Sequence, residues 1–90
     1  APAGLLADVK STLASAKYYR TWLMRLEGHA REVWEPEIEA SRQYFRAVAE
    51  YAAASGNTGG ATAAREDLEA AIKLARIDLG ELQGLPLPSQ

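Results

Sequence analysis

The first third of the chain carries apolar residues at the seven-residue spacing of a helix that packs along a narrow seam. One row contains Val9, Ala16, Leu23 and Ala30, and the other contains Leu5, Thr12, Tyr19, Leu26 and Val33. Such spacing predicts an amphipathic helix with coiled-coil-like packing. We therefore predict a first helix over about residues 4–34, with this seam as its packing face.

Gly28 and Pro36 compete for the position of the first turn. Gly28 falls farthest from the seam, so the helix is expected to continue through it at a cost of about 1 kcal/mol relative to alanine. At Pro36 the apolar pattern shifts by one position, and proline removes a helical hydrogen bond. The main prediction is a turn or kink at Glu35-Pro36. The alternative is a turn at Gly28-His29, with three helices of more equal length and Pro36 kinking the second.

Glycines divide the rest of the chain. A second helix is predicted over about 36–55, and Gly56 opens a Gly-rich loop at 56–60. A third helix is predicted over about 62–83, with Thr62 as its N-cap and Gly84 as its stop, followed by a Pro-containing tail at 85–90. The apolar stripe of the second helix is Ile38, Ser41, Phe45, Val48 and Ala52; the third has one row of Leu68, Ile72, Ala75, Leu79 and Leu82 and another of Ala70, Leu74 and Ile77.

These elements predict a single all-α domain, either a three-helix up-down bundle or a helical hairpin with a long first helix. Its core is expected to be thin, because 18 of the 90 residues are alanine. A first helix longer than its neighbours would leave Leu5, Leu6 and Val9 uncovered. Uncovered apolar residues of this kind favour pairing with another chain, so the sequence also allows a dimer.

Charge is unevenly distributed along the chain, although the net charge is only −2. Lys10, Lys17, Arg20 and Arg25 lie between Val9 and Leu26 without an acidic residue, and five glutamates follow between Glu27 and Glu39. This pattern favours an antiparallel homodimer in which the basic stretch of one copy lies near the acidic stretch of the other, and whose association weakens with salt. The negative net charge argues against a nucleic-acid partner.

The residues that could carry chemistry do not form a recognisable catalytic set. His29 is the only histidine, and it has no serine partner in any known catalytic pattern and no acidic residue directly after it. His29 with Glu32, Glu35 and Glu39 could hold a metal, but a solvated acidic rim is the better interpretation. The absence of cysteine excludes disulfides and thiolate chemistry. We therefore expect a protein that is not an enzyme, with no catalytic, cofactor-binding or metal-binding residues.

The sequence favours a non-enzymatic helical module that binds another protein or a second copy of itself. Aromatic residues beside arginine are enriched in protein interfaces, and packing against the third helix is their alternative role. A small-ligand or lipid-binding bundle, with Trp22 and Trp34 at the mouth of its cavity, and a metal-binding or sensory bundle are the alternative functions. The candidate partner-binding residues are Leu5, Leu6, Val9, Tyr18, Trp22, Arg25, His29 and Trp34.

The location of the protein is suggested only by its first residues. No apolar run approaches the roughly 18 residues of a membrane-spanning helix, so a soluble protein is expected. The chain opens on Ala1-Pro2-Ala3 and not on methionine, which favours an exported or periplasmic protein.

Overall fold

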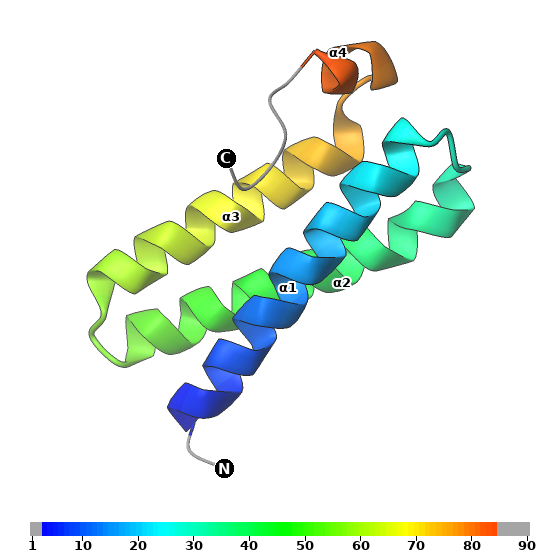
Figure 1. Ribbon diagram of the computed structural model, residues 1–90. Coiled ribbons are helices and arrows are strands. Elements are labelled where there is room, and N and C mark those ends of the chain that lie inside the picture. The colour runs from blue at the N-terminus through cyan, green and yellow to red at the C-terminus, as the bar shows by residue number, and fades with distance from the viewer. Residues whose placement is uncertain (1–2, 85–90) are drawn as a thin grey trace.

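The computed structural model describes residues 3–84, which form four helices and no strand. They are α1 (Ala3–Leu26), α2 (Arg31–Ala54), α3 (Thr58–Arg76) and the short α4 (Leu79–Gln83). Figure 1 shows α1 and α3 running in one general direction and α2 returning between them. The predicted all-α class is confirmed. The predicted tail at 85–90 lies outside the described residues.

The first turn lies at Gly28, where the sequence predicted a continuous helix. Gly28 has a φ of +81°, a conformation that residues with a Cβ rarely adopt. Its N–H donates to the carbonyl of Arg25 at 3.1 Å, and the N–H of His29 donates to the carbonyl of Met24 at 3.0 Å. This pair of bonds closes α1 with carbonyls that would otherwise lack partners. The predicted helix over 4–34 is therefore wrong, and the alternative turn at Gly28-His29 is the one that forms.

Pro36 lies inside α2, in its second turn, and does not mark the predicted turn at Glu35-Pro36. A proline there removes one hydrogen bond, the one that its N–H would donate to the carbonyl of Glu32. Glu32 is exposed, so water can satisfy that carbonyl. The helix therefore tolerates Pro36 at a position close to its beginning.

The second turn repeats the geometry of the first. Gly56 has a φ of +76°, as the sequence predicted, and the N–H of Asn57 donates to the carbonyl of Ala52 at 2.9 Å. The side chain of Asn57 then accepts a hydrogen bond from the N–H of Gly60 at 2.9 Å and caps α3. A Cβ at Gly60 would lie 2.9 Å from Cγ of Asn57, so glycine permits this close cap. The predicted N-cap at Thr62 is wrong, because Asn57 starts the helix earlier.

The third predicted helix is divided in two. Ile77 and Asp78 are extended between α3 and α4, with ψ angles of 145° and 149°. This break turns α4 across the end of the bundle, where it packs against α1. Leu82 is only 1% exposed there, whereas Leu79, which the sequence placed in the same apolar row, is exposed.

Arg25 fastens the end of α3 to the end of α1. Its Nη1 donates to the carbonyl oxygens of Leu74 and Ile77 at 2.8 and 2.7 Å. Leu74 lies in the last turn of α3 and Ile77 directly follows it, where the helix dipole favours a positive charge. Burial lowers the pKa of Arg25 from its ordinary value, although the guanidinium stays charged. One side chain therefore fixes the position at which α3 stops.

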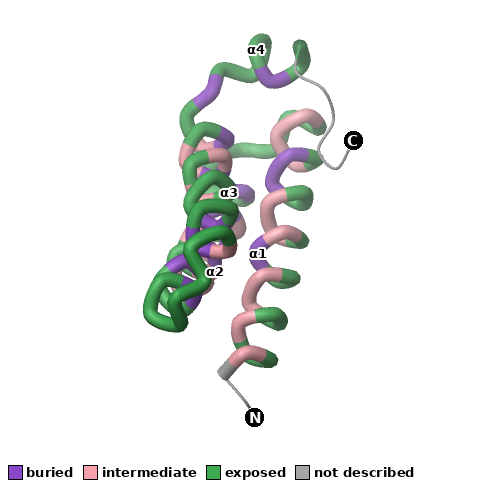
Figure 2. The backbone as a smooth tube through the Cα atoms, turned by 90° about the vertical axis from the view of Figure 1, so that its left-hand side faces the viewer, coloured by how far each residue is buried: buried purple, intermediate pink, exposed green. Residues whose placement is uncertain are grey.

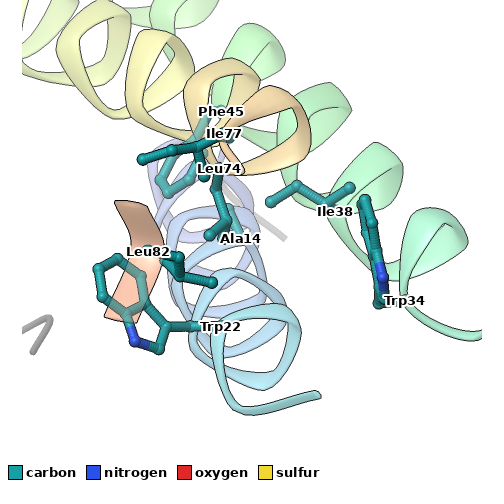
Figure 3. Packing of buried hydrophobic residues seen from close by; sticks show 9 residues of the cluster. Ala14, Trp22, Trp34, Ile38, Phe45, Leu74, Ile77 and Leu82 are labelled. Atoms are coloured by element: carbon teal, nitrogen blue, oxygen red, sulfur yellow. The ribbon is translucent and has the colours of Figure 1, made fainter. Parts of the chain in front are cut away.

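The core lies along α2, which packs against both α1 and α3. Ala14 and Ser41 are fully buried, and Oγ of Ser41 donates to the carbonyl of Ala14 at 2.7 Å. Two small residues at this crossing let α1 and α2 approach closely. Figure 3 shows Leu82 of α4 beside Trp22 of α1, whose buried Nε1 has no hydrogen-bond partner among the described residues. The principal buried cluster contains Ala14, Trp22, Trp34, Ile38, Phe45, Ala71, Leu74, Ile77 and Leu82.

Candidate functional site

Helix α1 presents an apolar face to the surroundings. Six of its large apolar side chains are exposed, with exposed fractions between 38% for Tyr19 and 58% for Leu23. Two smaller exposed residues, Thr12 and Ala16, lie between them on the helix. We call this surface the outer face of α1; it comprises Leu5, Leu6, Val9, Thr12, Leu13, Ala16, Tyr19 and Leu23.

The outer face lies opposite the residues that α1 contributes to the core. Ala14, Thr21 and Trp22 are buried, and a turn of 100° per residue places them on the side of the helix away from Val9 and Ala16. Figure 2 shows α1 at one edge of the molecule, with its exposed positions turned away from α2 and α3. The heptad rows of Leu5 to Leu23 thus form the surface of the chain and not its internal packing seam.

The exposure of the first turns has a different cause from the one predicted. Helices α1 and α2 each contain 24 residues, so α1 does not extend past a shorter neighbour. Leu5, Leu6 and Val9 are exposed because they lie on the outward side of α1. Leu13, Tyr19 and Leu23 continue the same surface, and sequence reasoning had not assigned them to a binding site. The sequence did contain a sign of this exposed surface: α1 has apolar residues around most of its circumference, and only one side of a helix can face a small core.

Few charges interrupt the outer face. Among the exposed residues from Leu5 to Leu23, only Asp8 and Arg20 are charged. A shallow groove of about 270 Å³ lies along this surface, lined by Asp8, Val9, Thr12 and Leu13. Contiguous exposed apolar surface of this extent is typical of interaction sites and uncommon elsewhere on small proteins.

The aromatic residues that the sequence proposed for partner binding pack within the chain. Trp22 and Trp34 are 6% and 4% exposed. Tyr18 is half-buried beside Trp22, with ring centroids 6.1 Å apart, and burial raises its pKa above the ordinary value. The side chain of Arg25 is held by α3, and its guanidinium also lies 4.7 Å from the ring centroid of Trp34. These four residues therefore support the fold at the end of the bundle near α4.

His29 lies in the exposed turn between α1 and α2. Its Nε2 is 3.4 Å from Oε1 of Glu27, on the surface. Glu35 pairs with Arg31 at 3.1 Å, and Glu39 pairs with Arg42 on the same helix. Within residues 3–84, no group of three or more acidic or histidine side chains gathers as a metal site would require. Two of the three carboxylates that the sequence considered for a metal, Glu35 and Glu39, thus have arginine partners.

The basic and acidic stretches of the sequence meet within one chain. Nζ of Lys17 lies 2.9 Å from Oε2 of Glu37, and Nε of Arg20 lies 3.5 Å from Oε1 of the same carboxylate. The turn at Gly28 folds α2 back along α1 and so brings these opposite charges together. Some of the charge complementarity that the sequence assigned to a dimer therefore stabilises the α1–α2 hairpin instead.

The ion pair at Glu37 should make stability depend on pH. The hydrogen bond from Lys17 lowers the pKa of Glu37 in the folded protein. The ion pair therefore adds to the free energy of unfolding above the unfolded pKa of about 4.3, and this contribution disappears as the pH falls through the pKa of Glu37 in the folded protein. We expect Glu37→Gln to lower the free energy of unfolding by about 0.5–1 kcal/mol at pH 7. Urea unfolding should show that this difference disappears in acid. The exposed Glu69→Gln serves as control, and an equal loss at pH 7 and in acid would contradict the assignment.

A second hollow, of about 390 Å³, opens at the other end of the hairpin. It lies between the beginning of α1, the end of α2 and the beginning of α3, and small residues such as Gly4, Ala7 and Ala52 line it. Neither tryptophan lies at its mouth, contrary to the expectation for a ligand-binding bundle. The hydroxyl of Tyr51 lies close to the backbone of Gly4 at the same place.

Comparisons with known proteins provide no assignment for this chain. No protein-family model, curated protein sequence or solved structure matches it. Within the described residues, none of the helices combines the length and apolar character needed to cross a bilayer.

Proposed function

We propose that this protein is a non-enzymatic helical interaction or assembly module whose partner covers the outer face of α1. The main observation that supports this proposal is that six large apolar side chains are exposed on one side of a single helix. A straight apolar stripe on a helix is suited to a groove between helices or to another amphipathic helix. The chemistry of the partner is therefore that of an apolar helical surface.

The polar side chains support a role without catalysis. Oγ1 of Thr21 donates to the carbonyl of Lys17 at 2.8 Å, and Oγ of Ser41 donates to the carbonyl of Ala14. Both hydroxyls are buried, and within the described residues each donates its proton to a backbone carbonyl and not to a basic side chain, so neither is activated as a nucleophile. His29 lies on the surface beside Glu27, away from both hydroxyls along the chain.

A nucleic-acid partner has less support than a protein partner. The net charge is −2, and Lys17, Arg20 and Arg25 are engaged with Glu37 or with backbone carbonyls. Arg20 is the single positive charge among the exposed residues from Leu5 to Leu23, and it is paired with Glu37. Such a surface offers little attraction to phosphates.

Selection of helical peptides from a display library tests the proposed face directly. Peptides that bind the full chain should be amphipathic, and Val9→Glu with Leu23→Glu should weaken their binding at least tenfold, because each glutamate loses hydration at the interface. Gln43→Glu on the exposed surface of α2 is the matched control. Circular dichroism checks that each variant folds. Peptides whose affinity is indifferent to the α1 changes, or a selection without binders, would contradict the proposal.

A small ligand is the second candidate, and the hollow lined by Gly4, Ala7 and Ala52 is the observation that favours it. Its lining includes Asp8, Ser11 and Tyr51, so a ligand there would be small and partly polar. Nuclear magnetic resonance with a fragment library should show shifts at Ala7 and Gly60 if the hollow binds ligands. Shifts confined to the outer face would favour the first proposal.

A further inference from the structure

The outer face of α1 has the residue order of a surface that can pair with itself. Its two heptad rows contain Val9, Ala16 and Leu23 on one side and Leu5, Thr12 and Tyr19 on the other. All six residues are exposed, and a turn of 100° per residue places them on one side of α1 between its first and its last turns. In antiparallel helix pairs, each residue of one row meets a residue of the other row in the partner helix.

We propose that a second copy of this chain covers the outer face, with the two α1 helices antiparallel and the two-fold axis at the level of Ala14. This inference rests on the proposed interaction function and specifies its partner. The register brings Leu5 opposite Leu23, Val9 opposite Tyr19, and Thr12 opposite Ala16 of the second copy. Each layer is formed twice by symmetry, as in other isologous interfaces.

Side-chain size supports this register. Leucines form the two outer layers, and Val9 with Tyr19 forms the intermediate layers. The central layers pair Thr12 with Ala16, whose small side chains let the two backbones approach closely. Residues of complementary size thus meet at every layer.

Charge favours the antiparallel orientation over the parallel one. A parallel pair would place Arg20 beside Arg20 and Asp8 beside Asp8 of the second copy. In the antiparallel register, each of these residues is 12 positions along the helix from its own copy, or about 18 Å at 1.5 Å per residue. That separation exceeds the Debye length of about 8 Å at physiological salt, so the like charges hardly repel.

The size of the face predicts a weak and reversible dimer. Six side chains that are 38–58% exposed leave on the order of 500 Å² of surface per copy, or about 1,000 Å² for a pair. This value lies at the low end of specific interfaces, and micromolar dissociation is expected. Because the seam is apolar and Lys17 and Arg20 pair with Glu37 in their own chain, association should change little with salt.

Sedimentation and cysteine crosslinking test the proposal. The chain contains no cysteine, so single cysteines report cleanly. With a short bis-maleimide, L13C should crosslink to itself, because Leu13 lies about 3 Å along the axis from its copy. L23C alone should not crosslink to itself, because the two copies of residue 23 lie about 27 Å apart along the axis. A mixture of L5C and L23C should crosslink, because the register places these two positions opposite each other. Val9→Glu should weaken dimerisation at least tenfold, and Gln43→Glu should leave it unchanged.

Results that differ from these expectations show whether the dimer, its register or the interaction function itself is wrong. A monomer at 100 μM that still binds selected helical peptides through α1 overturns the dimer and leaves the interaction function. Crosslinking of L23C to itself shows a parallel pair and overturns the register. A dimer that tolerates Val9→Glu uses another surface and overturns the inference, and failure of peptide binding as well removes the interaction function of α1.

Discussion

Replacing Ala14 by leucine should destabilise the fold by about 3 kcal/mol, whereas the same change at Ala16 should have little effect on the monomer. Ala14 is fully buried where α1 crosses α2, and its carbonyl accepts the hydrogen bond from Ser41. A larger side chain there must separate the two helices and break that bond. Ala16 lies on the outer face, where an added side chain meets solvent.

Urea unfolding followed by tryptophan fluorescence measures both variants at nanomolar concentration, well below the expected micromolar dissociation constant, so that association does not contribute. The two positions are two residues apart on one helix, so helix propensity is the same in both and is removed by the comparison. The experiment also distinguishes the fold from the heptad interpretation, in which Ala16 belongs to the internal seam. If Ala16→Leu lowered the free energy of unfolding strongly and Ala14→Leu only slightly, α1 would pack with the opposite side inward.

Replacing Arg25 by methionine should lower the free energy of unfolding by about 2–4 kcal/mol, because two partly buried carbonyls at the end of α3 lose a charged donor. The change leaves the oxygens of Leu74 and Ile77 without that partner and removes the cation over the ring of Trp34. Methionine retains much of the volume of arginine, so the loss reports mainly the polar contacts. Arg25→Lys should recover only part of it, since a single ammonium does not match the fork of guanidinium donors.

Arg31→Met is the matched control, because Arg31 also lies 4.7 Å from the ring centroid of Trp34 but is exposed and paired with Glu35. Arg31→Met should lower the free energy of unfolding by less than about 1 kcal/mol. Hydrogen exchange provides a second measure, since Arg25→Met should increase exchange in the last turn of α3 and in α4 first. Equal losses for the two arginines would indicate that the cation–π contacts, and not the carbonyl bonds, stabilise this end of the bundle.

Local chemistry in the sequence determined several parts of the fold. Gly56 is left-handed as predicted, because a glycine after a helical pattern can satisfy the final carbonyls at no steric cost. The predicted stripe of the second helix was correct at four of its five positions, since Ile38, Ser41, Phe45 and Ala52 are buried and Val48 is only partly buried. This stripe could be found because α2 lies between two neighbours, and its apolar residues face them.

The first helix shows where periodicity was insufficient. Gly28 was judged by its place on the helical wheel, although its ability to take a positive φ ends α1. The heptad rows from Leu5 to Leu23 do share one side of α1, but that side is exposed and does not form the predicted internal seam, because a periodic pattern does not state which side of a helix faces the core. In a chain with few large apolar residues, α1 directs Ala14, Thr21 and Trp22 inward and four of its five leucines outward, Leu26 being the exception. Of the candidate partner-binding residues, Leu5, Leu6 and Val9 consequently lie on the outer face.

The sequence by itself determined that the chain is helical and where glycine reverses it after α2, because these properties follow from local conformation and composition. Tertiary structure alone decided which side of α1 faces the core, since Ala14 and Ser41 can approach each other only after α2 has folded back from Gly28. It also decided that Arg25 and Trp34 stabilise the end of α3, because their partners lie far away along the chain.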